Sequence, residues 1–121
     1  MARTPTHLRL DLPWPPSINR YYRNIKGRTL ISREGREYRK RVIAILASTQ
    51  GLGDIRLFME LFVYPPDRRK RDLDNLVKPL QDALQHAKMF DDDGQIDGFS
   101  IWRKSPVDGG VVNVYLEPFN A

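Results

Sequence analysis

Polar and apolar residues alternate in two segments of the chain, and this alternation predicts β-strands. Residues 8–12 alternate leucines with charged side chains, which is typical of a strand with one buried face, and Pro13 ends it. Residues 55–64 alternate as well, but apolar side chains occupy both sets of positions. We therefore expect a long central strand over 55–64, which Pro65 terminates.

Helical spacing appears in two further segments. Ser32 is a suitable N-cap for the first helix, which Gly51 and Gly53 would stop. The stripe of this helix consists of Tyr38, Val42, Ile45, Leu46 and Thr49. The second helix should begin near Asn75, on a stripe formed by Leu76, Leu80, Ala83, Leu84 and Ala87. Pro79 interrupts this stripe, so we expect a weakened or bent first turn.

The remaining segments complete the predicted fold. Residues 95–104 and 111–117 are predicted strands, which 105–110 would join as a hairpin. Residues 17–30 are polar and irregular, which predicts a loop outside the core. The order β, loop, α, β, α, β, β predicts a single small α+β domain over residues 1–121. We expect a mixed β-sheet of about four strands with two main helices.

The composition favours an acidic partner. The chain of 121 residues, long enough for one domain, carries a net charge of +5 and has an isoelectric point of about 9.7, which suits nucleic acid. It contains no cysteine, which excludes disulfides, cysteine-based zinc sites and a thiol nucleophile. No apolar run approaches the roughly 20 residues that span a bilayer, and no signal-peptide pattern opens the sequence. We therefore expect a cytoplasmic protein without a membrane partner.

The candidate chemistry is concentrated in residues 67–78. Four consecutive cations precede two carboxylates, Asp72 and Asp74, and Lys78 follows. Side chains two residues apart point to the same side of an extended backbone, so both carboxylates should face one way. Lys78 comes one helical turn after Asp74, so the three groups should converge. Asp74 would also serve as the N-cap of the second helix.

Two carboxylates form a sparse site for Mg²⁺, which is usually bound by one or two protein carboxylates, water and substrate phosphate. A third carboxylate would come from the acidic cluster 91–93, which the sheet could return beside Asp72 and Asp74. The spacing does not select one of the three aspartates. The alternative interpretation is that Asp74 only caps a helix and that the cluster is a solvated turn.

Two basic segments are candidates for contact with nucleic acid. The cations beside the acidic pair should contact phosphates, and the alternative is a solvated face; they are Arg68, Arg69, Lys70 and Arg71. Residues 17–30 combine cations with aromatic rings in Arg20, Tyr21, Tyr22, Arg23, Lys26 and Arg28. Such a segment could stack on unpaired bases, whereas its tyrosines could equally pack in the core or in a dimer interface.

Several motifs occur together in this chain. Residues 65–78 read Pro-Pro-Asp-Arg-Arg-Lys-Arg-Asp-Leu-Asp-Asn-Leu-Val-Lys. Further motifs occupy residues 12–23, 27–29, 35–39, 82–84 and 92–96. With these motifs the chain resembles the RusA family of Holliday junction resolvases, and the likeness extends over residues 8–117.

This resemblance implies a small, homodimeric, Mg²⁺-dependent endonuclease that binds four-way DNA junctions and nicks two strands symmetrically. Members of the family occur in bacteria and often in phage or prophage genomes, and DNA recombination, DNA repair and phage DNA processing are all compatible with this activity. The family's catalytic groups fall here on Asp72, Asp74, Asp93 and Lys78, with the three aspartates as metal ligands. Asp92 is the alternative third carboxylate, because the additional acid at Asp91 shifts the register by one residue.

A dimer would also follow from the expected reaction, since two symmetric nicks need two active sites related by a twofold axis. Phe58 and Phe62 could form the contact between protomers, or they could lie under a helix. Two other functions stay open: a nuclease for other branched DNA, and a nucleic-acid-binding protein without catalysis.

Overall fold

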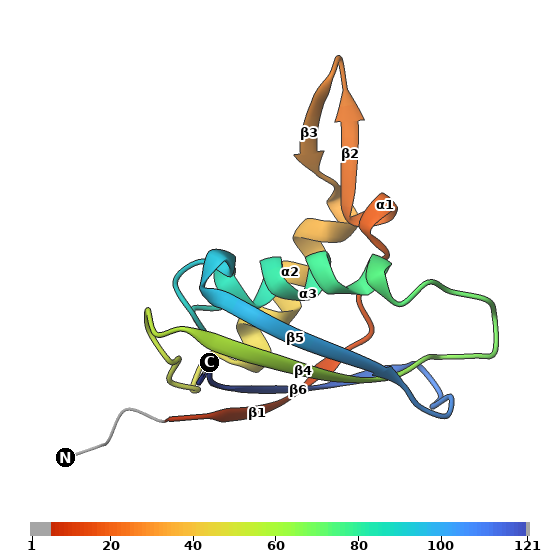
Figure 1. The fold of residues 1–121 in the computed structure, drawn as a ribbon. Helices are drawn as coiled ribbons and strands as arrows, with labels where there is room; N and C mark the ends of the chain where they lie inside the picture. Colours follow the sequence, from red (N-terminus) through yellow and green to blue (C-terminus); the bar gives the residue numbers. More distant parts are fainter. Residues whose placement is uncertain (1–5, 121) are drawn as a thin grey trace.

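A mixed four-stranded sheet forms the centre of the protein (Figure 1). The structure is a computed structural model that describes residues 6–120. The strand order is β1-β6-β4-β5, with the strands β1 (Leu8–Pro13), β4 (Leu57–Tyr64), β5 (Ile96–Arg103) and β6 (Val111–Pro118). β5 runs parallel to β4, and the other neighbours are antiparallel. The expected α+β class, mixed sheet and central strand are therefore confirmed.

Two helices, α2 (Arg33–Ile45) and α3 (Asp74–His86), pack on one side of this sheet (Figure 1). α2 begins as predicted, because the Ser32 hydroxyl accepts a hydrogen bond from the Gly35 amide at 3.0 Å. It ends at Ile45, well before Gly51, where the sequence predicted the end of this helix. A Cβ at Gly51 would lie 1.9 Å from the Lys88 carbonyl oxygen, so this glycine permits a close backbone approach instead.

The core lies between the sheet and the two helices. It takes four fully buried side chains from β4, namely Leu57, Met59, Leu61 and Val63. α3 adds Leu76, Leu80, Ala83 and Leu84, which confirms most of its predicted stripe. Each fully buried aliphatic side chain contributes about 1.5–3 kcal/mol of hydrophobic free energy. α3 continues through Pro79, which is itself buried, whereas Ile45 of the α2 stripe is exposed.

Residues 17–30 are not the predicted loop. They contain the short helix α1 (Ile18–Tyr21) and the strand β2 (Tyr22–Ile25), which pairs with β3 (Arg28–Ile31). This hairpin stands away from the main sheet in Figure 1, so most of its residues are exposed. Tyr21 is nevertheless completely buried, because its ring enters the core and its hydroxyl finds an acceptor there.

The predicted hairpin between β5 and β6 is also wrong. β4 separates these two strands, since it pairs with β5 on one side and with β6 on the other. The connecting segment crosses the end of β4, where the Lys104 amide donates to the Val63 carbonyl and the Val107 amide to the Pro65 carbonyl, both at 2.9 Å. Local alternation predicted the strands correctly, but it carries no information about this crossing.

Phe58 and Phe62 lie on the sheet face opposite α2 and α3, because their neighbours Leu57, Leu61 and Val63 point toward the helices. Both phenylalanines are half-buried. The alternative in which they lie under a helix is therefore excluded. Among residues 6–120, no helix is long and apolar enough to cross a membrane.

Candidate active site and nucleic-acid interface

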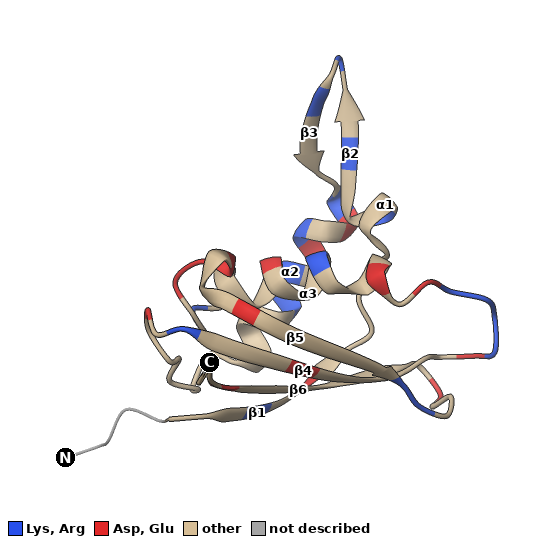
Figure 2. Cartoon of the chain, viewed as in Figure 1, with Lys and Arg blue, Asp and Glu red and all other residues tan. Residues whose placement is uncertain are grey.

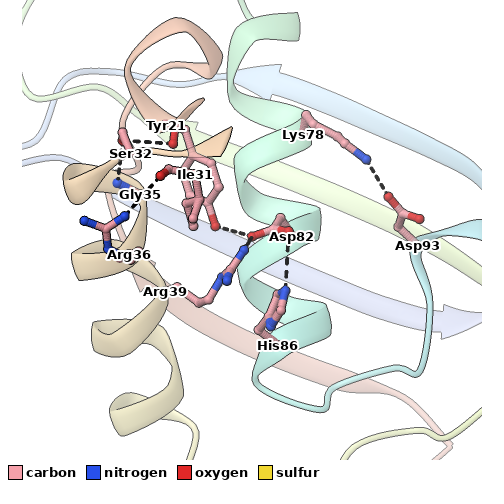
Figure 3. A network of polar contacts seen from close by, with 10 residues as sticks. All are labelled: Tyr21, Ile31, Ser32, Gly35, Arg36, Arg39, Lys78, Asp82, His86 and Asp93. Atoms are coloured by element: carbon pink, nitrogen blue, oxygen red, sulfur yellow. Dashed lines mark hydrogen bonds and ion pairs between the residues drawn. The ribbon is translucent and has the colours of Figure 1, made fainter. Parts of the chain in front are cut away.

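Lys78 and Asp93 form the centre of the candidate site. Lys78 projects from the second turn of α3, and its Nζ lies 2.7 Å from Oδ2 of Asp93 (Figure 3). The Lys78 side chain is half-exposed, so the pair is open to a substrate. The hydrogen bond with Asp93 is the main cause that raises the pKa of Lys78 above its ordinary value. The structure therefore places Asp93 of the acidic cluster 91–93 beside the helix that carries Lys78.

The acidic turn is held by a buried glutamine. The side-chain oxygen of Gln95 accepts hydrogen bonds from the amides of Asp91 and Asp92, both at 2.7 Å. Its side-chain nitrogen donates to the carbonyls of Gly53 and Ile55. This glutamine was missed as a positioning residue, although the spacing of Asp92 and Gln95 matches a capping box and could have indicated it.

Asp92 and Asp93 differ in their surroundings. The Asp92 carboxylate caps the short 3-10 helix η1 (Asp93–Gln95) by accepting from the Gly94 amide at 2.8 Å. The Asp93 amide donates to Gln85 of α3 at 2.9 Å, and its carboxylate faces Lys78. Asp93 rather than Asp92 therefore lies beside the lysine.

Asp72 and Asp74 are both exposed at the start of α3. Leu73 between them has helical dihedral angles (φ −62°, ψ −38°). The backbone at this position is therefore helical, whereas we expected it to be extended. Leu73 occupies the N-cap position of α3, and no side chain caps the helix there. Asp74 is the first residue of the helix, so the prediction that Asp74 is the N-cap is wrong. The helical turn begins early because the Asn75 amide already bonds to the Asp72 carbonyl at 3.3 Å.

Within residues 6–120, no group of three or more acidic, histidine or cysteine side chains is arranged to hold a metal ion. The structure thus pairs Asp93 with Lys78 but does not gather Asp72, Asp74 and Asp93 into a finished metal site. Their assignment as metal ligands stays a prediction.

The four cations before Asp72 divide into two kinds. Arg71 is held in the loop, where Nη1 lies 2.7 Å from Oδ1 of Asp67 and the guanidinium lies 5.8 Å from the Trp14 ring centroid. The hydrogen bond from Arg71 is the main cause that lowers the pKa of Asp67 to about 2. The other three cations, Arg68, Arg69 and Lys70, are exposed. Arg71 therefore shapes the loop that presents the other three cations to solvent.

This basic loop borders two depressions on the surface. One has a volume of about 520 Å³ and is lined by residues that include Trp14, Arg20, Arg69, Lys70 and Asp72. The other, of about 590 Å³, adds Arg68, Arg103 and Lys104. Figure 2 shows the loop as a continuous blue segment beyond the acidic start of α3. The predicted adjacency of carboxylates and cations is thus present, and both depressions suit an anionic ligand.

The β2–β3 hairpin carries the second set of predicted DNA contacts. Arg23, Lys26 and Arg28 are exposed on it, and Lys26 and Gly27 form its turn with positive φ angles of 50° and 76°. Tyr22 is half-buried at its base and packs edge-on against Tyr21, with 4.9 Å between ring centroids. Tyr21 itself belongs to the core.

A polar network that the sequence reasoning missed holds this hairpin to the helices. Asp82 of α3 accepts hydrogen bonds from the Tyr21 hydroxyl and from Arg39 of α2, whose Nη2 lies 2.8 Å from Oδ2 (Figure 3). His86 lies 3.6 Å from the other oxygen of Asp82. Burial, followed by the contact with Asp82, raises the pKa of Tyr21. The network connects α1, α2 and the helix that carries Lys78, so it fixes the hairpin base relative to the candidate site.

Comparison with known proteins gives a consistent result. The model of the family described as Endodeoxyribonuclease RusA matches residues 13–117. The chain is 44% identical over 105 residues to the crossover junction endodeoxyribonuclease RusA of Shigella sonnei (strain Ss046), covering 84% of this chain and 86% of that protein. Over the same length and with the same coverage, the chain is 43% identical to the protein of that name from Escherichia coli (strain K12). It is 44% identical to the one from Enterobacteria phage 82.

The family match and the similar proteins define the class as a DNA-cutting enzyme rather than a binding module alone. The chain belongs to the RusA family of endodeoxyribonucleases, which the match over residues 13–117 shows. The family and the enzyme class expected from the motifs are therefore confirmed.

Proposed function

We propose that this protein is a crossover junction endodeoxyribonuclease that resolves four-way DNA junctions by paired, symmetric, Mg²⁺-dependent hydrolysis of phosphodiester bonds. The observation that carries the proposal is the pair of Lys78 and Asp93, 2.7 Å apart beside an exposed cationic loop. A homodimer would supply the two active sites that paired nicks require. The protein would act in the cytoplasm of a bacterium, where a cellular or phage genome lies.

The donor chemistry of the site fits a hard divalent cation. Asp72, Asp74 and Asp93 would hold Mg²⁺, which commonly binds to one or two carboxylates together with water and substrate phosphate. A complete protein cage is therefore not required before DNA binds. Asp93 contacts Lys78 through Oδ2, so its other carboxylate oxygen can serve the metal. When bound, the ion would offset charge on the phosphate and acidify the attacking water.

Lys78 would act as a fixed positive charge. The hydrogen bond with Asp93 favours the ammonium form of Lys78 and raises its pKa. This ammonium group would stabilise the negative charge that builds on the non-bridging oxygens during in-line attack. The Asp93 carboxylate would hold this ammonium group in place.

The exposed cations would bind the phosphate backbone on both sides of this site. Arg68, Arg69 and Lys70 would follow one arm of the junction, and the hairpin cations Arg23, Lys26 and Arg28 another. Arg20 pairs with Glu34 at 3.3 Å and would bind DNA from the depression beside the loop. Tyr22, half-exposed at the hairpin base, would stack on an unpaired base at the junction centre. Arg71 would support the loop.

The substrate class is tested by incubating the protein with Mg²⁺ and a synthetic four-way junction, fork, flap or linear duplex at equal concentrations. We expect symmetric nicks in the junction at a rate at least about 100-fold above the rate on the duplex, since only the junction offers two related cleavage sites. Equal cutting of forks and flaps would instead indicate a general nuclease for branched DNA. Binding without any nicking would indicate a protein without catalysis.

A further inference from the structure

We propose that the β2–β3 hairpin places two aliphatic side chains, Ile25 and Leu30, against base faces that a four-way junction exposes at its centre. The proposal rests on the proposed function and deepens it, because it assigns the preference for branched over linear DNA to two residues. We call the side of the hairpin that carries them the wedge face. The register of the two strands places four side chains on this face, namely Arg23, Ile25, Arg28 and Leu30.

The aliphatic side chains of the wedge face form a small apolar patch outside the core. Ile25 and Leu30 are 38% and 43% exposed, and neither belongs to the hydrophobic core. The register pairs Ile25 with Arg28 and Leu30 with Arg23, so the two aliphatic side chains are diagonal neighbours. Diagonal neighbours lie about 7–8 Å apart, which allows long side chains to share one patch. The hairpin carries this patch away from the main sheet (Figure 1).

The charge of the hairpin favours a polyanion as the partner of this patch. Residues 22–31 contain three cations, Arg23, Lys26 and Arg28, and no carboxylate. All three cations are exposed. They would contact phosphates, whereas aliphatic side chains form no bond with phosphate and would contact bases. Isoleucine and leucine are among the apolar side chains that DNA-binding proteins insert between bases.

The hairpin is fixed beside the candidate site. Before β2, the Tyr21 hydroxyl donates to Asp82 of α3, one helical turn after Lys78. After β3, the Ser32 amide and hydroxyl both donate to the Tyr21 carbonyl, at 2.8 and 2.9 Å. DNA held at Lys78 would therefore meet the hairpin. A hairpin that is tied at both ends needs little further ordering when it binds, so less conformational entropy opposes insertion.

Exposed base faces distinguish a four-way junction from a linear duplex. In a duplex each base is stacked on both sides, and an apolar side chain can enter only if it unstacks a step, which costs free energy. At the centre of a junction the strands exchange partners and stacking is interrupted, so the cost of insertion is smaller. Ile25 and Leu30 would thus add affinity for a junction that they do not add for a duplex.

The test measures DNA binding with a chelator in place of Mg²⁺, so that binding is measured apart from cleavage. The double variant Ile25→Ser/Leu30→Ser removes the patch, and Ile45→Ser is the matched control, because Ile45 is an exposed aliphatic residue at the end of α2. Fluorescence anisotropy gives the Kd for a labelled junction and for a linear duplex. We expect the double variant to raise the Kd at least about tenfold for the junction and less than about threefold for the duplex. The control should bind both as the wild type does.

Equal changes in the two dissociation constants, or no change in either, would overturn the proposal. The salt dependence of the same affinities separates a lost apolar contact from lost phosphate contacts. Apolar contacts release no counterions, so the double variant should keep the wild-type slope of log affinity against log salt concentration. Arg28→Ala removes a cation from the same face and should reduce this slope by about 0.9. A reduced slope for the double variant would assign its lost affinity to phosphate contacts and contradict the wedge face.

A labelling experiment decides the case in which the double variant fails to fold. The chain has no cysteine, so Ile25→Cys places a single reactive group on the wedge face, and Ser48→Cys places one beyond α2. We expect a saturating junction to slow alkylation of Ile25→Cys at least about tenfold, and a saturating duplex to slow it less than about threefold. Ser48→Cys should react at the same rate throughout. Equal protection of Ile25→Cys by junction and duplex would refute the proposal.

Neither experiment requires cleavage, so the inference and the proposed function can fail separately. A protein that selects junctions through the wedge face but nicks none of them would support the inference and refute the function. A protein that nicks junctions, and whose double variant keeps the wild-type preference for junctions over duplex, would do the reverse.

Discussion

At the scale of single residues, one ion pair defines the candidate site. The sequence predicted that the cluster 91–93 would return to the acidic pair, and the structure returns Asp93 to Lys78. The sequence could not predict which aspartate would face inward, because that depends on the side-chain oxygens of Gln85 and Gln95, which accept hydrogen bonds from backbone amides of the acidic turn. Only the folded chain places Gln85 of α3 and the buried Gln95 beside this turn.

Asp67 should make the basic loop sensitive to acid. Arg71 lowers the pKa of Asp67 in the folded protein to about 2, so the stabilisation by this carboxylate is complete above pH ~4 and is lost as the pH falls toward 2. The melting temperature of the wild type should therefore decline more between pH ~4 and ~2 than that of Asp67→Asn. Calorimetry over this range measures both slopes, and equal slopes would refute the assigned role of Asp67.

At the scale of elements, local patterns predicted the long strands and helices but not their connections. Leu57 to Val63 show the alternation of a central strand, and the capping residue Ser32 indicates the start of α2. The β2–β3 hairpin carries mostly exposed side chains, so no alternation reveals it. The crossing between β5 and β6 depends on pairing with β4, whose residues lie 39 to 61 positions from their partners in sequence.

The connection between the hairpin and α3 depends on Asp82. Removing the hydroxyl that donates to this carboxylate, by Tyr21→Phe, should lower the free energy of unfolding by about 2 kcal/mol, because the acceptor is charged and mostly buried. Urea denaturation of the variant and the wild type measures the difference.

Tyr22→Phe is the matched control, since it removes the neighbouring hydroxyl from a half-buried ring. We expect it to change the unfolding free energy by less than about 0.5 kcal/mol. If both variants lower the free energy of unfolding by the same amount, the hydrogen bond between Tyr21 and Asp82 does not provide the predicted stabilisation.

At the scale of the whole molecule, charge is divided between surfaces. Cations gather on the loop 68–71 and on the β2–β3 hairpin (Figure 2). The net charge of +5 predicted an acidic partner but not this division. Both segments are exposed because neither belongs to the four-stranded sheet or to the two long helices.

Junction affinity should depend on salt through the exposed loop cations. Arg69→Ala should reduce the slope of log affinity against log salt concentration by about 0.9, because one phosphate contact is lost. Arg33→Ala is the control, since this exposed arginine pairs with Glu37 on α2. Fluorescence anisotropy with a labelled junction measures both slopes. If Arg69→Ala leaves this slope unchanged, Arg69 does not contact DNA phosphate and the assignment of the loop as a DNA-binding surface is contradicted.

The central claim is that Asp72 and Asp93, distant in sequence, serve one Mg²⁺-dependent cleavage reaction. The most direct test is the single-turnover rate of junction nicking with Mg²⁺ for Asp72→Asn, Asp93→Asn and the control Asp91→Asn. We predict losses of at least about 100-fold for the first two, with junction binding retained, and a change below about threefold for the control. Nicking at the wild-type rate by Asp72→Asn or Asp93→Asn would contradict the account.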